Sequence, residues 1–222
     1  MKVAEAERTL DRGFIKCSLM KAMVVFVHPQ PDDFTNGLRD ATVAALRDTG
    51  HDVVTVEPYR EGFEAAMSAE ELSAYSTQSE SQIADPIARR YADLVAEATS
   101  IAFVFPMWWS GPPSMLKGFF DRVLVGGVAF RMDDNGRIRP GLQHVRNVFI
   151  VTAAEPPGHF PHRSVRHLAT RFAKSLRRAT GRKTKTTVEW AGPGIRGDAT
   201  AEAHFIAQVG RQITRRSTGG AR

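Results

Sequence analysis

Short apolar runs alternate along the chain with longer amphipathic segments. Continuous apolar runs cover residues 22–27 and 101–105, the pattern of parallel strands buried on both faces. Further strands are predicted over residues 52–56, 148–152 and 184–190. Apolar positions at helical spacing predict helices over residues 36–49, 86–98, 114–124, 163–180 and 199–215. Because strand and helix alternate with no internal repeat or dividing linker, the pattern predicts an α/β fold: a five-stranded parallel sheet with helices on both faces.

The ends of the first predicted helices carry the expected chemical features. Thr35 can cap the first helix, Leu38 lies on its apolar face, and Gly50 stands where helices commonly end. Asp85 and Pro86 form a cap followed by a first-turn proline, which opens the next long helix. These features support the helix assignments independently of the apolar pattern.

Two long connections interrupt the alternation. Residues 57–84 are polar and contain a short predicted helix at 69–75. Residues 125–146 contain a hairpin-like turn, Asp-Asn-Gly, at 134–136. Connections of this length in a compact domain usually serve a function or form part of an interface.

The bulk composition indicates one well-buried domain, which we expect over residues 21–216. The chain has 222 residues, of which 42% are hydrophobic and 24% are charged. Residues 1–20 are polar and lack periodicity, so we expect a loose extension there, and residues 217–222 are expected to form a basic tail. The apolar runs are too short to cross a bilayer, and no secretory signal is visible. Cys17 is the single cysteine, so no intrachain disulfide can form, which fits a cytoplasmic location.

The net charge of +6 raises the question of a nucleic-acid partner. Most of the excess charge lies in residues 163–185 and 211–222, and it is not accompanied by zinc-finger spacing, an RNA-binding sheet motif or a basic zipper. A solvated helix face explains this distribution better, so we expect no nucleic-acid partner. A basic surface also attracts anionic dinucleotides.

In a parallel sheet of this kind, ligands bind outside the carboxyl ends of the strands. The loop after the first predicted strand runs from His28 to Asn36, where the amides that begin the next helix can bind a phosphate. The loop lacks GxGxxG and the P-loop motif, which argues against nucleotide binding in the Rossmann manner. A proline-stiffened turn with a surface histidine explains the loop equally well.

The loop after the third predicted strand, residues 106–113, contains two adjacent tryptophans. Trp108 and Trp109 cannot both point into the core from an extended segment, so at least one should face a cleft or a partner. Flat aromatic surfaces beside backbone amides suit a planar isoalloxazine ring. The alternative is that both tryptophans pack under a neighbouring loop or in a dimer interface.

The loop after the fourth predicted strand, from Thr152 to His159, contains small residues that permit close backbone approach to a ligand. This feature is weak by itself, because many turn-rich loops share it. The remaining histidines show no metal-ligand spacing, so we expect no metal site.

Together these segments resemble the flavodoxin-like NAD(P)H:quinone oxidoreductases, the DT-diaphorase family, and their bacterial NAD(P)H-dependent oxidoreductase relatives. The resemblance runs from about Lys21 to Arg215. Its most specific part is PMWWSGPPSMLKGFFDRVLVGGVAF at 106–130, followed by GRIRPGL at 136–142. The second signature is HPQPDDFTNGL at 28–38.

The resemblance implies a non-covalent flavin, FAD or FMN, with NAD(P)H as co-substrate and a homodimer whose active sites lie at the subunit boundary. The residues carried over to the flavin phosphates and ribityl chain are His28, Phe34, Thr35 and Asn36. Those carried over to the isoalloxazine are Pro106, Met107, Trp108 and Trp109. Those at the far side of the ring are Thr152, Ala153, Ala154 and Glu155.

The implied reaction is hydride transfer from NAD(P)H to the flavin and then to a quinone-like acceptor, by ping-pong kinetics. The sequence departs from the family pattern in four places. Asp33 stands where Ser is frequent, and Ser110 replaces an aromatic residue. The third loop has Ala153-Ala154-Glu155 where Tyr or Gly are frequent, so that Glu155 adds negative charge near the ring, and the Tyr/His pair of some members has no clear match. Asp33 and the stretch Ala153-Ala154-Glu155 keep open a flavin-free regulatory domain on the same fold. The other alternative is a flavodoxin-type electron carrier. Electron carriers of that type tend to be acidic and to lack the long connection at 125–146.

Overall fold

The computed structural model describes residues 20–75, 83–109, 111–154, 162–192 and 194–218. The predicted N-terminal extension, apart from Met20, lies outside the described residues, as do residues 219–222 of the predicted tail. Residues 217 and 218 belong to the last helix.

Five parallel strands form the central sheet, in the order β2-β1-β3-β6-β7. The strands are β1 (Met20–Phe26), β2 (His51–Val56), β3 (Ser100–Met107), β6 (Asn147–Ala154) and β7 (Lys185–Ala191). A separate antiparallel hairpin consists of β4 (Phe130–Met132) and β5 (Ile138–Pro140). The helices are α1 (Asp33–Asp48), α2 (Ala69–Ala74), α3 (Pro86–Glu97), α4 (Ser114–Val123), α5 (His162–Thr180) and α6 (Ala199–Thr218). The predicted α/β class and five-stranded parallel sheet are confirmed.

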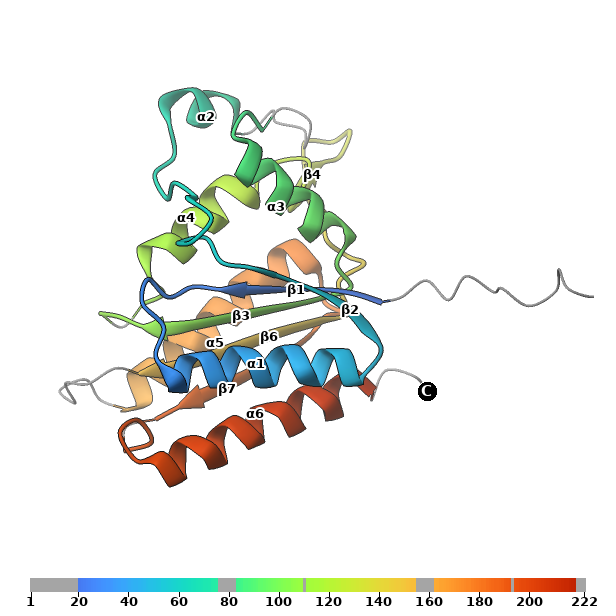
Figure 1. Ribbon diagram of the computed structural model, residues 1–222. Coiled ribbons are helices and arrows are strands. Elements are labelled where there is room, and N and C mark those ends of the chain that lie inside the picture. The colour runs from blue at the N-terminus through green and yellow to red at the C-terminus, as the bar shows by residue number, and fades with distance from the viewer. Residues whose placement is uncertain (1–19, 76–82, 110, 155–161, 193, 219–222) are drawn as a thin grey trace, which may run out of the picture.

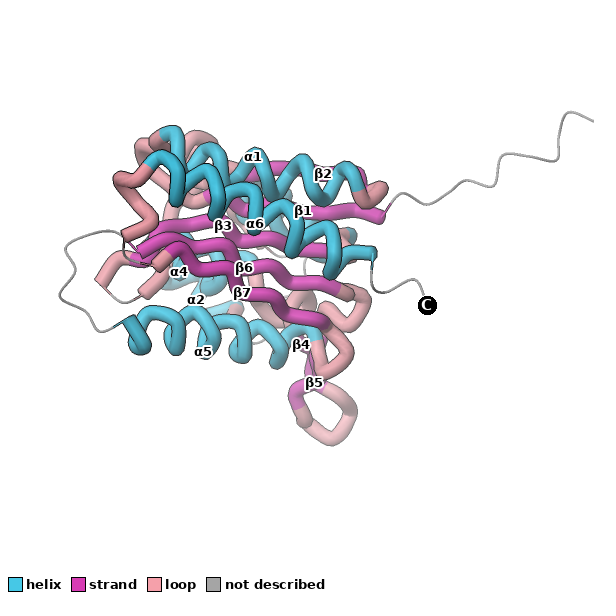
Figure 2. Tube along the Cα trace, turned by 90° about the horizontal axis from the view of Figure 1, so that it is seen from below, coloured by secondary structure: helices cyan, strands magenta, loops and turns pink. Residues whose placement is uncertain are grey.

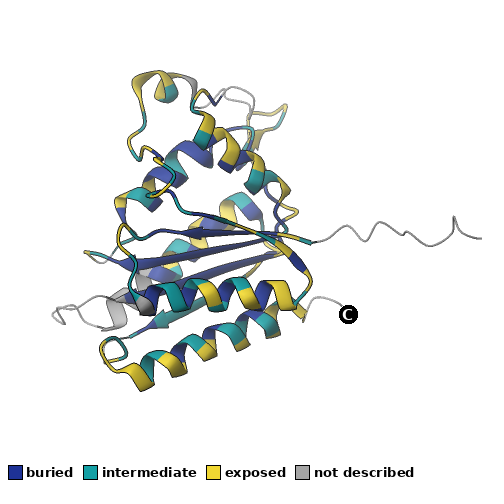
Figure 3. Ribbon diagram, viewed as in Figure 1, coloured by how far each residue is buried: buried dark blue, intermediate teal, exposed yellow. Residues whose placement is uncertain are grey.

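Helices cover both faces of the sheet and create two cores (Figures 1 and 2). On one face, α1 and α6 lie side by side and bury residues such as Leu38 and Val209 against β1, β3 and β6. On the other face, α3, α4 and α5 bury a larger and more aromatic core, which includes Tyr91, Phe103 and Phe119. The central strands are buried along almost their whole length, as continuous apolar runs predict (Figure 3).

Several element boundaries differ from the sequence predictions, and the differences matter at the carboxyl edge of the sheet. The first helix begins at Asp33, with Asp32 as its cap, and not at Asn36 with Thr35 as its cap. The third strand continues through Pro106 to Met107, so these two residues extend the ladder beside β6 and do not form the loop. Proline lacks a backbone N–H and cannot donate a ladder hydrogen bond, so it is tolerated only where that missing bond costs little stability. The end of β3 is such a place.

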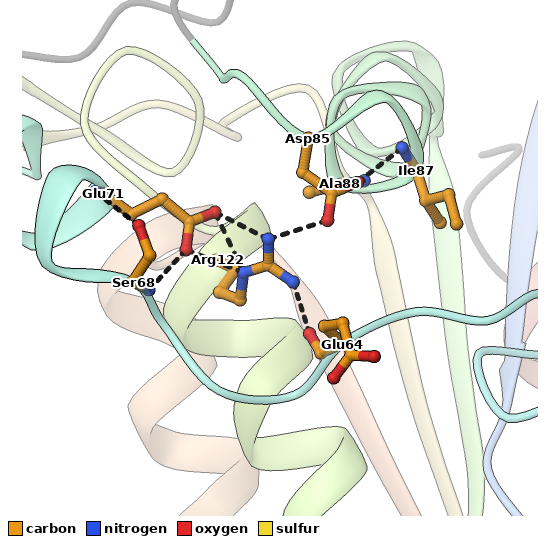
Figure 4. A network of polar contacts seen from close by, with 7 residues as sticks. All are labelled: Glu64, Ser68, Glu71, Asp85, Ile87, Ala88 and Arg122. Carbon is orange, nitrogen blue, oxygen red and sulfur yellow. Dashed lines mark hydrogen bonds and ion pairs between the residues drawn. The ribbon is translucent and has the colours of Figure 1, made fainter.

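The described parts of the first long connection, residues 57–75 and 83–84, are held against α4 by a buried arginine (Figure 4). The side chain of Arg122 is 6% exposed, and its Nε donates to both carboxylate oxygens of Glu71 at 2.9 and 3.0 Å. Its Nη2 donates to Asp85 at 2.7 Å, and its Nη1 donates to the carbonyl oxygen of Glu64. Removing one member of such a buried network typically costs about 3–5 kcal/mol, because the others are left buried and unpaired. Arg122 therefore joins α2, the cap of α3 and α4 into one unit.

A glycine permits the connection to approach α4 closely. A Cβ built on Gly118 would lie 2.3 Å from the carbonyl oxygen of Ala65. A side chain at this position would therefore push the connection away from the helix.

A buried polar chain crosses the sheet at the opposite, amino edge. Nδ1 of His51 lies 3.2 Å from the carbonyl oxygen of Leu46, and its Nε2 lies 3.0 Å from the Ser100 hydroxyl. The Asn147 side-chain amide donates to the same hydroxyl at 3.3 Å. These contacts suit a neutral imidazole, with Nδ1 donating and Nε2 accepting. Burial lowers the pKa of His51 below its ordinary value of 6.5, against the opposing effect of the bond to Leu46.

This network predicts a pH dependence of stability. Above pH 6.5 the imidazole is neutral in both the folded and unfolded chain; as the pH falls through 6.5, the unfolded chain takes up the proton first. The free energy of unfolding should therefore decrease from about pH 7.5 to about pH 5.5, and this decrease should shrink in His51→Gln. Urea denaturation at several pH values measures both effects. The exposed His144→Gln serves as the control, and an undiminished decrease in His51→Gln would contradict the assignment.

Candidate functional site

The loops after β1 and β3 meet at the carboxyl edge, where the strand order reverses. From β1 the chain moves outward to β2 and then returns to the other side of β1 as β3, which makes the gap between β1 and β3 the switch point of the sheet. The His28 and Trp108 rings lie there with centroids 6.0 Å apart and planes inclined at 66°. The structure thus brings the first two predicted loops into contact.

The tryptophan loop is a tight, strained turn. Trp108 and Gly111 exchange two backbone hydrogen bonds, 3.0 and 2.9 Å long. Trp109 between them has a φ of +48°, which few residues other than glycine adopt, and it is 92% exposed. Trp108 is half-buried. As the sequence indicates, the two rings do not both enter the core; Ser110 lies outside the described residues.

Near the carboxyl ends of β6 and β7, two neighbouring residues carry buried polar groups that have no hydrogen-bond partner among the described residues. The Thr152 hydroxyl is fully buried and has no partner among the described residues. Trp190 pairs with Thr152 in the ladder, so both side chains lie on the same face of the sheet, and its indole N–H likewise has no partner in the described part of the chain. Most buried polar groups in proteins are hydrogen-bonded, so a bound ligand is one explanation of two neighbouring exceptions near a sheet edge.

The remaining predicted residues of β6 are less informative. Ala153 is buried against the opposite core, which contains α1 and α6. Ala154 ends the strand, but its side chain lies outside the described part, as does the whole of Glu155.

The N-terminus of α1 lies at the same edge and is capped from within the chain. Oδ1 of Asp32 accepts from the Thr35 amide at 2.9 Å, and the Thr35 hydroxyl reaches back to the Asp32 backbone amide at 3.1 Å. This reciprocal pair is a capping box, in which both side chains are engaged. Oδ2 of Asp32 forms an ion pair with Arg196, which lies between β7 and α6.

Asp32 is held in its charged form. Burial raises the pKa of its carboxyl group, but the hydrogen bonds from Thr35 and the nearby Arg196 guanidinium outweigh that effect. The net result is a pKa below the ordinary value of 3.8, so the group carries a full negative charge at neutral pH.

Other predicted residues of the first loop face inward. The Phe34 ring is buried and lies 6.3 Å from the Phe205 ring, between α1 and α6. Asn36 is half-buried in the first turn of the helix. The side chain of Asp33 lies outside the described residues. Phe34 can therefore contribute only its backbone to a ligand at this edge.

Sequence reasoning missed Asp32 and Arg196. The spacing of Asp32 and Thr35 matches a capping box and could have located the cap. Arg196 is 164 residues away from Asp32, and no local pattern predicts that they meet. They meet because α6 packs beside α1, so the loop before α6 returns to the N-terminus of α1.

A separate apolar groove, with a cavity volume of about 410 Å³, lies between α4, α5 and the β4–β5 hairpin. Apolar lining residues include Phe120, Phe130 and Phe172, with Lys117 and Arg178 also lining it. Ile138 lines the groove from the hairpin and is 70% exposed. The groove is thus an uncovered apolar surface of the described chain.

Two properties of the described residues bear on the kind of site. Within them, histidine, cysteine, aspartate and glutamate side chains nowhere gather in threes at metal-binding distance. Equally, the described helices include none that is both long and apolar enough to cross a bilayer.

Comparison with known proteins identifies the fold. The sequence matches the protein family described as "Flavodoxin-like fold" over residues 20–204. Among curated proteins, NAD(P)H dehydrogenase [quinone] 1 of Rattus norvegicus is 32% identical over 126 residues, which cover 51% of this chain and 46% of that protein. The aligned part thus spans about half the length of that relative.

Solved structures agree on the architecture. An NAD(P)H:quinone oxidoreductase from Methanothermobacter marburgensis has a TM-score of 0.71 at 23% identity, with 88% of this chain and 96% of that chain covered. An FMN-dependent NADH-azoreductase from Bacillus anthracis, solved in complex with FMN, has a TM-score of 0.63 at 12% identity, with 91% of this chain and 100% of that chain covered. At these identities the likeness shows the fold.

Proposed function

Because the chain belongs to the flavodoxin-like fold family, we propose that it is a flavin-dependent oxidoreductase, which takes hydride from NAD(P)H and delivers it to quinone-like acceptors by a ping-pong mechanism. The observation that carries the proposal is the contact of His28 with Trp108 at the switch point of the sheet. On the strand next to β3, the Thr152 hydroxyl has no hydrogen-bond partner among the described residues. The likeness to quinone oxidoreductases supports the reaction class.

The residues at the tryptophan end of the site fit an isoalloxazine ring. Such a ring has a flat aromatic face and a polar edge. Trp109 exposes an indole on a strained backbone, which suits stacking on the face. The hydroxyl of Thr152 and the indole N–H of Trp190 suit hydrogen bonding to the edge, since both lack partners among the described residues. A flavin in this position would therefore satisfy buried groups that the described chain leaves unsatisfied.

When bound, the flavin accepts and donates the hydride, so the protein needs no general base. The work of the chain is to bind, orient and exclude water. His28 and Trp108 line the switch point, while the buried Phe105 lies next to Thr152 in the ladder and keeps that side apolar. The turn between Trp108 and Gly111 fixes the indole of Trp109 at the edge.

We also propose a homodimer and a cytoplasmic location. The groove between α4, α5 and the hairpin is apolar and uncovered in the described chain, and a second copy is the partner that the family resemblance implies. The single cysteine is in keeping with a reducing compartment.

The flavin spectrum tests the proposal and separates it from both alternatives. We expect the purified chain, supplied with excess FMN or FAD, to show bound flavin absorption that bleaches anaerobically with NADH or NADPH and returns on adding a quinone. An electron carrier would hold flavin that neither nicotinamide bleaches. A regulatory domain would hold no flavin even at saturation, which would refute the enzyme assignment.

The Thr152 hydroxyl should serve ligand binding and not folding. Thr152→Val removes a hydroxyl that has no partner among the described residues, so the free energy of unfolding should stay level or rise. The flavin Kd should increase about fivefold through the loss of one hydrogen bond. Urea denaturation and flavin titration measure the two effects. Thr186→Val is the matched control, because its hydroxyl is also unpartnered among the described residues but lies in register with Val148 near the other end of the sheet. An unchanged Kd in Thr152→Val would contradict the role.

A substitution in the apolar groove tests the proposed dimer. Ile138→Asp places a charge on its apolar lining and should yield a monomer at micromolar concentrations where the native chain is a dimer, as measured by light scattering after gel filtration. Leu72→Asp is the control, since Leu72 is 66% exposed on α2 and does not line the groove. A monomeric native chain, or a dimeric Ile138→Asp variant, would refute this interface.

A further inference from the structure

The N-terminus of α1 is the natural place for a flavin phosphate in this fold. A helix N-terminus presents unsatisfied amides and the positive end of the helix dipole, and both favour an anion. In this chain α1 begins a few residues after β1, at the switch point where His28 meets Trp108. A flavin whose ring lies at the tryptophan loop would thus direct its phosphate towards this helix.

An anion of the chain itself already lies there. Oδ1 of Asp32 accepts from both the amide and the hydroxyl of Thr35, each at 2.9 Å. Oδ2 forms an ion pair with Arg196, whose side chain is 24% exposed. Both carboxylate oxygens are therefore engaged, and the carboxylate satisfies the helix end as a phosphate would.

A second anion at this position would meet opposition. A phosphate that approached the same amides would face the Asp32 carboxylate across a partly buried space, where charges interact more strongly than in water. The Arg196 guanidinium would have to be shared between carboxylate and phosphate. Asp33, the next residue, is also acidic in the sequence. The phosphate end of the site thus does not fit a flavin phosphate, whereas the ring end does fit the ring.

We propose that Asp32 is a specificity-determining residue that occupies the phosphate position at α1, so that the chain binds flavin through the ring and gains nothing from the phosphate. The inference rests on the proposed flavin site. It adds that the phosphate group of the flavin contributes no affinity. FMN should accordingly bind the native chain no more tightly than riboflavin does.

The test compares the Kd of FMN with that of riboflavin, by quenching of flavin fluorescence, in the native chain and in Asp32→Asn. Asparagine caps helices as well as aspartate does, so α1 is retained while the charge is lost. We expect the ratio of the FMN Kd to the riboflavin Kd to be one or more in the native chain. In Asp32→Asn it should fall at least about tenfold, because the repulsion is removed. Any effect of the substitution that weakens the binding of both ligands equally leaves this ratio unchanged.

Asp198→Asn is the matched control. Asp198 accepts hydrogen bonds from the amides of Thr200 and Ala201 at the start of α6, so this variant loses the same charge at a different helix cap. Its ratio should equal that of the native chain. A fall of the same size in Asp198→Asn would assign the effect to net charge and overturn the proposal.

The remaining outcomes separate this inference from the function on which it rests. A native chain that binds FMN at least about tenfold more tightly than riboflavin, or an unchanged ratio in Asp32→Asn, overturns the role of Asp32 and leaves the flavin enzyme standing. If neither flavin binds to either protein, the flavin site itself is refuted, and the inference with it.

Discussion

The two-sided burial of β1, β3 and β6 requires a helical layer on each face of the sheet. Parallel strands can be joined only by crossovers, so the helices return the chain to the amino edge and the connecting loops collect at the carboxyl edge. The proposed site lies where these loops meet at the reversal of strand order. Its position is thus a consequence of the strand order β2-β1-β3-β6-β7 and not of any single motif.

At the carboxyl edge of the sheet, the polar groups of β6 and β7 and those of α1 differ in whether they have partners within the chain. At β6 and β7, the chain leaves Thr152 and Trp190 without partners among the described residues, which costs stability unless a ligand satisfies them. At the N-terminus of α1, by contrast, the polar groups have partners within the chain. Asp32, Thr35 and Arg196 satisfy the helix end internally, which favours the fold and opposes an external anion. In the proposed site, the β6–β7 end thus offers polar groups to a ligand, whereas the α1 end is satisfied by the chain's own carboxylate.

The connection at 57–84 illustrates how a long polar segment becomes part of the body of the domain. Arg122 binds Glu71 and Asp85 in a buried network, and Gly118 allows the backbone at Ala65 to approach α4 (Figure 4). Arg122 is 37 residues away from Asp85 in the sequence and 51 residues away from Glu71, so the network joins distant segments. It also holds α2, whose neighbour Tyr75 lines the apolar groove, so the shape of the groove depends on it.

What the sequence by itself determined was the order and type of the elements, together with features encoded within a few residues. The alternation of strand-like and helical segments predicted five parallel strands, and the adjacency of Trp108 and Trp109 predicted that at least one ring would lie outside the core. These two predictions are confirmed because the periodicity of strands and helices, and the alternation of side chains along a strand, are properties of the local backbone. The resemblance to a known family then located the three loops.

Only the tertiary structure decided which side chains face the site and which are used elsewhere. Phe34 lies in the core because α6 packs against α1, and Pro106 and Met107 extend β3 because β6 offers them a ladder. The pairing of Asp32 with Arg196 spans 164 residues and depends on the same neighbouring helices. Contacts of this kind arise from the packing of elements that are distant in the chain, and no local pattern of residues contains that information.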